Sequence, residues 1–170
     1  MRQGYTLPSL NLPPVLRTFL ALATLVLVLP VTVMAAAAVA GPTHADVSLL
    51  HEMNRVRAEH GLGPLVFDAH LERAAEAHSR AMLRSNVFTH GAFASRMLQY
   101  DVAGSVAAEN LAWGTRVRSS ARGIVAAWLA SPEHRANLLA PRFGRVGVGA
   151  LVGAFQGFEG AHVVTADFAG

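Results

Sequence analysis

Two histidines and one glutamate stand in mostly apolar, small-residue stretches near the middle of this chain. His90 lies in VFTHG, Glu109 in AAENLAWG and His134 in WLASPEHR. Two imidazoles and a carboxylate are the side chains that a divalent metal ion or an acid/base pair requires. The three residues therefore form a candidate site if the fold brings them together.

Apolar residues at helical spacing predict the helices that must position this site. The first helix covers residues 46–60. The second begins after Asp68, whose side chain suits an N-cap, and runs to about Arg84. A loop then carries His90 and leads into a short helical turn over residues 93–100.

Two further helices are expected after Glu109. Ser119 or Ser120 caps the third, and Ser131 with Pro132 reads as the N-cap and first residue of the fourth. Glu133 falls in the first turn of that helix, where the helix dipole favours a carboxylate. His134 therefore sits close to a helix N-terminus.

The periodicity changes near the C-terminus. Apolar residues alternate with glycines around residues 146–150, and residues 162–168 read as a second strand, with residues 153–160 as the hairpin connection. Residues 109–113 could not be assigned to helix or strand. Helices followed by strands predict an α+β fold with an antiparallel sheet.

The N-terminal segment resembles a secretory signal peptide. Residues 1–18 contain Arg2 and Arg17 but no acid, residues 19–40 are uncharged and apolar, and AVA precedes Gly41. An uncleaved membrane anchor is the alternative, because about 20 apolar residues can span a bilayer. We expect a leader over 1–40, a linker over 41–45 and one domain over 46–170.

Composition excludes two classes of function for that domain. Without the leader, 12 arginines face 11 acidic residues, and there is no lysine. A net charge this close to zero argues against nucleic-acid binding, which requires a basic face. The chain also has no cysteine, so thiolate chemistry, cysteine-ligated zinc and disulfides are excluded.

Several stretches, taken in order, resemble the CAP superfamily, whose domain is also called SCP-like. They are NRVR from Asn54 with GLGPL, then FTH, ENLAWG, WLASPEHRANLL from Trp128, and VGVG from Val146. The resemblance covers residues 46–170 and is to the short bacterial branch. It implies a three-layer α-β-α sandwich with a central antiparallel sheet and a cleft lined by two histidines and two acids.

The resemblance also assigns roles to individual residues. His90 and His134 match the two cleft histidines, and Glu109 matches the acid of the Glu-Asn motif. The position of the second acid is Ser131 here. Glu133 is nearby, but successive helical residues diverge by about 100°, so Glu133 and His134 do not easily point into one cleft. A metal site would then have three ligands: His90, Glu109 and His134.

Two interpretations of the candidate site remain open. His90, Glu109 and His134 could hold a divalent ion, with zinc the expected metal, or the carboxylate could simply orient an imidazole in the cleft floor. His78, on the inner face of its helix, is expected to pack between elements, and Asn110 to act as a structural amide.

Three functions are consistent with this sequence. The first is an exported, non-catalytic module that binds a lipid, a peptide or a cell-wall-derived molecule in the cleft, outside the cell or in its envelope. The second is a secreted zinc-assisted hydrolase, with Glu133 as a poorly placed base. The third is a structural envelope protein. Contact with a membrane is expected only through an uncleaved N-terminal segment.

Overall fold

The computed structural model describes residues 41–170, and the expected leader over residues 1–40 lies outside them. Helices and strands occur in the order α1, β1, α2, α3, β2, η2, α4, α5, β3 and β4. The helices are α1 (His44–Glu59), α2 (Ala69–Ser85), α3 (Phe93–Gln99), the 3-10 helix η2 (Arg116–Ser119), α4 (Ala121–Ala130) and α5 (Pro132–Leu138). The strands are β1 (Val66–Phe67), β2 (Ala107–Gly114), β3 (Arg145–Phe155) and β4 (Phe158–Ala169).

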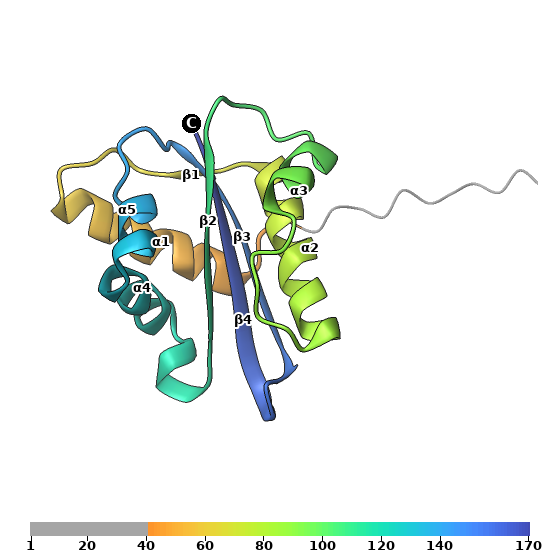
Figure 1. Cartoon of the computed structure of the whole chain (residues 1–170). Helices are drawn as coiled ribbons and strands as arrows, with labels where there is room; N and C mark the ends of the chain where they lie inside the picture. Colours follow the sequence, from red (N-terminus) through yellow and green to blue (C-terminus); the bar gives the residue numbers. More distant parts are fainter. Residues whose placement is uncertain (1–40) are drawn as a thin grey trace, which may run out of the picture. The chain divides into compact units, whose positions relative to one another are not determined.

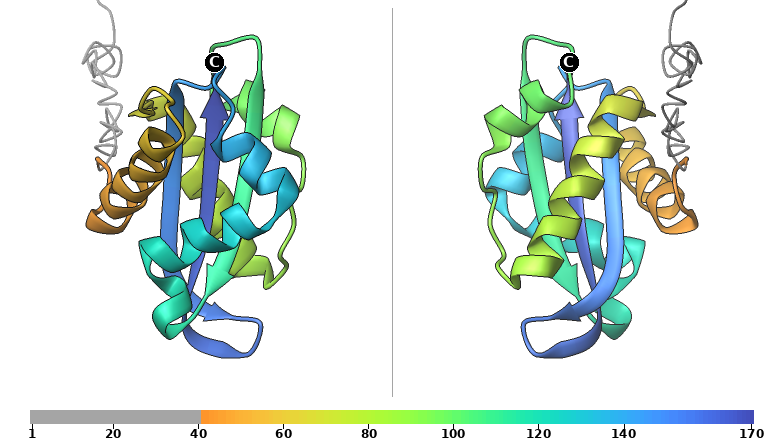
Figure 2. Two further views of the ribbon diagram at one scale, coloured as in Figure 1. Left: turned by 90° about the vertical axis from the view of Figure 1, so that its left-hand side faces the viewer. Right: turned by 90° about the vertical axis from the view of Figure 1, so that its right-hand side faces the viewer.

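The sheet lies between two layers of helices. Its strand order is β1-β3-β4-β2. Strands β3, β4 and β2 pair antiparallel, and the two-residue β1 adds to β3 in parallel. Helices α1, α4 and α5 cover one face, and α2 and α3 cover the other (Figures 1 and 2). The α-β-α sandwich that the resemblance to the CAP superfamily implied is confirmed, with β1 as a parallel addition to the antiparallel sheet.

Side-chain caps explain where three of the helices begin. Thr43 and Asp46 form a reciprocal capping box, so α1 starts two residues earlier than expected. Asp68 accepts hydrogen bonds from backbone N–H groups at the start of α2, and Ser120 does the same for α4. Ser131 occupies the N-cap position of α5, but its hydroxyl makes no capping hydrogen bond.

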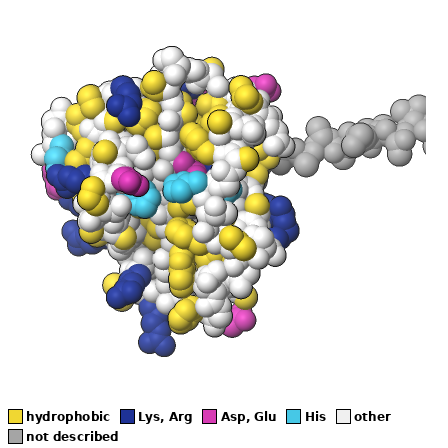
Figure 3. Space-filling view, in the orientation of Figure 1, with side chains coloured by type: hydrophobic (Ala, Val, Ile, Leu, Met, Phe, Trp, Pro, Cys, Tyr) yellow, Lys and Arg dark blue, Asp and Glu magenta, His cyan; other side chains and the backbone are white. Residues whose placement is uncertain are grey.

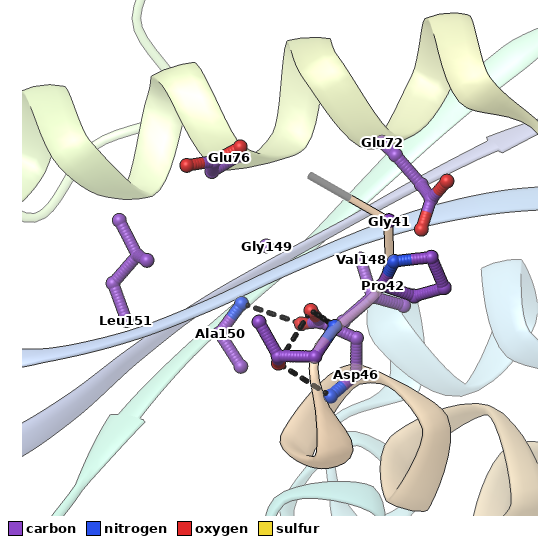
Figure 4. A pocket seen from close by; sticks show the side chains of 10 residues that line it. Gly41, Pro42, Asp46, Glu72, Glu76, Val148, Gly149, Ala150 and Leu151 are labelled. Carbon is purple, nitrogen blue, oxygen red and sulfur yellow. Dashed lines mark hydrogen bonds between the residues drawn. The ribbon is translucent and has the colours of Figure 1, made fainter. Parts of the chain in front are cut away.

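Asp46 also fastens α1 to the sheet. Its carboxylate accepts hydrogen bonds from the backbone N–H of Thr43 at 2.8 Å and of Ala150 in β3 at 2.9 Å. The carboxylate lies beside a cavity of about 70 Å³ that Glu72 and Glu76 of α2 also line (Figure 4). The bond to Ala150 thus joins the start of α1 to β3.

The glycines of β3 let α2 approach the sheet closely. Val146 and Val148 belong to the core cluster that contains residues of α1 and α4, and Gly147 and Gly149 alternate with them and face α2. A Cβ atom on Gly147 would lie 1.9 Å from the carbonyl carbon of Leu71. The alternation that predicted a strand therefore also brings α2 onto that strand.

Two parts of the sheet differ from expectation. The unassigned residues 109–113 belong to β2, whose central residues are buried, so its sequence shows no clean alternation. The hairpin between β3 and β4 turns at Gln156 and Gly157, so both strands run further than expected. Glycines inside these strands made residues 153–160 look like a loop.

A buried arginine connects two loops of the domain by hydrogen bonds. Arg57 in α1 is 1% exposed, and its guanidinium donates to the backbone carbonyls of Gly63, Leu138, Ala140 and Phe143 at 2.8–3.1 Å. These bonds tie the loop after α1 to the chain after α5 and satisfy carbonyls at a helix end.

Among residues 41–170, no helix has both the length and the apolar character needed to cross a bilayer.

Candidate functional site

Glu109 lies at the centre of the site. It sits in β2, directly opposite Asp167 of β4, and its side chain is only 2% exposed. Its two oxygens meet different partners: Oε1 is 2.6 Å from Nδ1 of His90, and Oε2 contacts a guanidinium nitrogen of Arg96. Both carboxylate oxygens are therefore engaged within the protein.

His90 is held by the loop between α2 and α3. Gly91 turns the chain with φ +56°, and its N–H donates to the Thr89 hydroxyl at 3.1 Å. Nε2 of the buried His78 lies 2.8 Å from the Thr89 carbonyl oxygen and fixes this loop to α2. Nδ1 of His90 faces Glu109, and the side chain is 57% exposed, so much of the ring is open to solvent.

Arg96 brings a single cation between two buried carboxylates. Its Nη2 contacts Glu109 and lies 3.9 Å from Oδ1 of Asp167, whose side chain is fully buried. Within the described residues, Nε of Arg96 and both carboxylate oxygens of Asp167 have no hydrogen-bond partner. The cluster therefore holds more negative than positive groups, with their hydrogen bonding incomplete.

Two amide side chains position the backbone of His134. Asn110, next to Glu109 in β2, donates through Nδ2 to the His134 carbonyl at 2.9 Å and accepts from Nδ2 of Asn137 at 3.0 Å. The rings of His90 and His134 have centroids 6.5 Å apart and are tilted by 44°. Histidine and acidic side chains gather in the middle of this face (Figure 3).

Burial shifts the pKa values of the cluster in opposite directions. Burial raises the pKa of Glu109 to about 7, although the Arg96 guanidinium opposes this shift. Burial and then the charge of Glu109 raise the pKa of Asp167 well above its usual range. Burial and Arg96 lower the pKa of His78 to about 4, and burial and His90 lower the pKa of His134.

These shifts give the cluster a definite chemical character. The buried carboxyls hold protons at higher pH than usual, whereas His78 and His134 are neutral at neutral pH. A hollow of about 300 Å³ opens between α2 and α3 behind the cluster, with His78 and Arg96 among its lining residues.

The structure brings together three of the four residues named from the sequence. His90, Glu109 and His134 converge, whereas Glu133 is exposed in α5 and, within residues 41–170, makes no hydrogen bond or ion pair. Asn110 is a structural amide, as expected. His78 does more than pack, because its Nε2 lies 3.7 Å from Oε2 of Glu109.

Arg96 and Asp167 were missed by sequence reasoning. Asp167 had a signal, because it is the one acidic residue in the otherwise mostly apolar stretch 161–168. An acid in a buried strand is unusual unless it is paired. Arg96 had none, because its α3 helix is short and no acidic residue lies beside it in the sequence to indicate a partner.

The arrangement does not match a three-ligand metal site. Within residues 41–170, no three His, Asp or Glu side chains are grouped to hold one metal ion. Glu109 already contacts His90 and Arg96, so the imidazoles of His90 and His134 are the two donors left. A carboxylate bonded to a histidine is nevertheless an arrangement that orients imidazoles toward metals.

The chain is similar to several known proteins over this domain. A family model described as the cysteine-rich secretory protein family (CAP) matches residues 50–168. Protein YkwD of Bacillus subtilis (strain 168) is 35% identical over 101 residues, which cover 56% of this chain and 38% of YkwD. Membrane protein YlbC of the same organism is 31% identical over 112 residues, covering 63% of this chain and 32% of YlbC. The chain thus matches about a third of the length of these relatives.

Solved structures have the same fold. An extracellular protein containing an SCP domain from Bacillus anthracis has a TM-score of 0.62 and 27% identity, covering 74% of this chain and 40% of that one. An outer surface protein from Borrelia burgdorferi has a TM-score of 0.61 and 24% identity, covering 71% of this chain and 87% of that one. The matched domain therefore makes up most of the Borrelia burgdorferi chain.

Proposed function

This chain belongs to the cysteine-rich secretory protein family although it contains no cysteine, and on that premise we propose that it is an exported binding module. His90 and His134 would hold the polar group of a lipid, a peptide or a cell-wall-derived molecule. The observation that carries this proposal is the pair of neighbouring imidazoles, one of them fixed by the buried Glu109.

The contacts of the pair support binding of a polar group. Because Nδ1 of His90 is paired with Glu109, Nε2 is left for a ligand. The lowered pKa of His134 keeps this ring neutral at neutral pH, so it can donate or accept a hydrogen bond. Two prepositioned hydrogen-bonding groups fit a hydroxyl, amide or carboxyl group.

The surroundings support a ligand with an apolar part. Phe88, two residues before His90, is exposed, and its ring lies 6.5 Å from that of Phe155. Hydrophobic side chains continue below the histidines on the same face (Figure 3). An amphiphile could place its polar group at the histidines and its apolar part along this band.

The same contacts favour binding over turnover. Both oxygens of Glu109 are engaged, and Asp167 is fully buried, so neither is a free base at the surface. Ser131 lies at a helix N-cap, and no hydrogen bond links its hydroxyl to an imidazole. Glu109, Asp167 and Ser131 are therefore not placed to attack a molecule bound at the histidines.

Extraction and titration together test the binding proposal. Organic extracts of the purified chain are analysed by mass spectrometry, and binding of a fluorescent fatty acid is titrated for wild type, His90→Gln and His134→Gln. We expect bound or exchangeable ligand in wild type and at least about tenfold weaker binding in both variants, the equivalent of one lost charge-assisted hydrogen bond.

His51→Gln is the matched control, because His51 is exposed on α1. An empty extract, together with equal titrations for the site variants and His51→Gln, would refute the proposal.

A zinc-assisted hydrolase remains the second candidate, and one observation favours it. Glu109 bonds to Nδ1 of His90, and a metal-binding histidine commonly has a carboxylate bonded to its other ring nitrogen in this way. His90 and His134 would then be the ligands of a weak zinc site, one short of the three protein ligands usual for catalytic zinc. Calorimetry of zinc with wild type and His134→Ala decides: equal heats would remove these residues as ligands.

A further inference from the structure

A second surface lies at the far end of β2 from α3. The 3-10 helix η2 and the turn between β3 and β4 lie at the same end of the domain (Figures 1 and 2). Two large apolar side chains are exposed there: Val117 at 83% and Phe158 at 53%. Apolar side chains this exposed at one end of a domain indicate a contact surface.

Aromatic and cationic groups meet in the same place. The rings of Trp113 and Phe158 have centroids 5.7 Å apart, and a hollow of about 480 Å³ lies between these rings and η2. Arg116 and Arg118 also line this hollow. We call the set Trp113, Arg116, Val117, Arg118 and Phe158 the tip.

The charge of the tip is positive. Arg116 and Arg118 are exposed, and within the described residues neither takes part in an ion pair. Glu159, which follows Phe158, is the exposed acid at this end. Two cations against one acid leave an attraction for anions beside the exposed apolar side chains.

Local contacts anchor the η2 part of the tip. A Cβ atom on Gly123 of α4 would lie 2.7 Å from the Val117 carbonyl oxygen, so η2 packs directly against this helix. The hydroxyls of Ser119 and Ser120 donate to the carbonyls of Arg116 and Val117 at 2.7 and 2.8 Å. A surface that is already ordered loses little entropy when it binds.

We propose that the tip docks on an anionic lipid surface. Val117 and Phe158 enter the boundary between headgroups and acyl chains, Trp113 lies at headgroup level, and Arg116 and Arg118 bind lipid phosphates. Such a surface accepts apolar and cationic side chains together, whereas a soluble polyanion would use only the arginines. This contact does not use the two histidines, although Trp113 packs on Phe155 of the apolar band with ring centroids 5.6 Å apart, and it does not require a membrane-spanning segment.

Tryptophan quenching tests this contact on the full chain. Trp113 and Trp128 are the two tryptophans, and Trp128 is buried in the core. Vesicles of phosphatidylglycerol mixed with brominated phosphatidylcholine should quench Trp113, and vesicles of brominated phosphatidylcholine alone should quench it much less. Because quenching is local, it reports on the tip even if residues 1–40 also bind the vesicles.

Variants of the tip make the test specific. Each arginine near an anionic leaflet strengthens partition about fivefold, so Arg116→Asn and Arg118→Gln should each lower by about that factor the partition coefficient obtained from quenching against lipid concentration. Val117→Ser should also weaken it, since the apolar side chain is lost. The matched controls are Leu98→Ser, on the exposed side of α3, and Arg142→Gln, before the start of β3.

Three outcomes would overturn the proposal. The first is unquenched Trp113 in wild type with anionic vesicles, and the second is equal quenching in tip and control variants. The third is binding of soluble polyphosphate as tightly as vesicles, with no effect of Val117→Ser, which would make the tip a polyanion site.

Discussion

Arg96 offers the most direct test of the buried cluster. Its guanidinium is the cation in contact with Glu109, and it lies 3.9 Å from Asp167. Replacing Arg96 by Met keeps an unbranched side chain but removes the charge. We expect Arg96→Met to destabilise the fold strongly, because two buried carboxyls lose the group that stabilises their ionised forms.

The structure sets the size of this effect. At an effective dielectric constant of about 20, fully ionised groups at the observed Arg96–Asp167 separation interact by about 4 kcal/mol. This is an upper value, because the pKa of Asp167 is raised well above its usual range and its carboxyl is partly protonated. Removing one partner of a buried ion pair costs about 3–5 kcal/mol. Because the pKa of Glu109 is about 7, protonation relieves part of the loss near neutrality. We therefore expect a loss of about 3 kcal/mol in the free energy of unfolding near neutral pH.

The loss should depend on pH with a definite sign. Without Arg96, the carboxyl pKa values of the folded protein rise further above their unfolded values. The folded state then holds more protons than the unfolded state, so its stability falls as pH rises. The destabilisation by Arg96→Met should be smaller near about pH 5 and larger near about pH 8.

Urea unfolding followed by tryptophan fluorescence measures both effects. Wild type, Arg96→Met, Asp167→Asn and the double variant are compared at each pH. The double variant should recover part of the stability, because one buried carboxyl has become an amide. A loss below about 1 kcal/mol at the higher pH, an equal loss at both pH values, or no recovery in the double variant would refute this account of the cluster.

Three further predictions concern neighbouring features. The pKa of His78 falls to about 4 on folding, so folding has to release the proton of this ring at low pH. As pH rises from about 4 to about 6.5, the free energy of unfolding of wild type should therefore increase by as much as about 3 kcal/mol relative to His78→Gln. Urea titrations across that range would show no such divergence if the shift is absent. Asn110→Ala should cost about 2 kcal/mol in chemical denaturation and disturb the NMR signals of His134, whose carbonyl loses its donor; an unchanged ring environment would contradict the positioning role. Gly147→Ala should lower stability by about 3 kcal/mol or more in thermal unfolding because its methyl group would overlap the backbone of α2, whereas Gly63→Ala, with open space around it, should change little; similar losses at the two glycines would contradict the close packing.

Local patterns in the sequence predicted the helical layers well. Asp68 was recognised as a capping residue, and the cap of α4 was narrowed to Ser119 or Ser120, of which Ser120 is the observed one. Such predictions succeed because a cap depends on a few neighbouring positions. The glycines of β3 were recognised as part of a strand, but their packing against α2 depends on a segment about seventy residues away. Strand β2 was not assigned because its burial on both faces removes the alternation that identifies a strand.

The candidate site was only partly predictable for the same reason. His90, Glu109 and His134 carry recognisable local motifs, so they could be named. Asp167 joins them only through its register opposite Glu109, which pairs strands far apart in the chain. Arg96 joins them through the placement of a short helix, and nothing in its own segment indicates that placement.

The guanidinium of Arg57 has a consequence for where this domain can fold. In a family described as cysteine-rich, this chain joins distant loops with four hydrogen bonds to carbonyl oxygens. Thiol reductants do not break such bonds, and no oxidant is needed to form them. The polypeptide should therefore reach the same shape in a reducing cytoplasm and in an oxidising exterior, and its folding should not depend on a disulfide-forming catalyst.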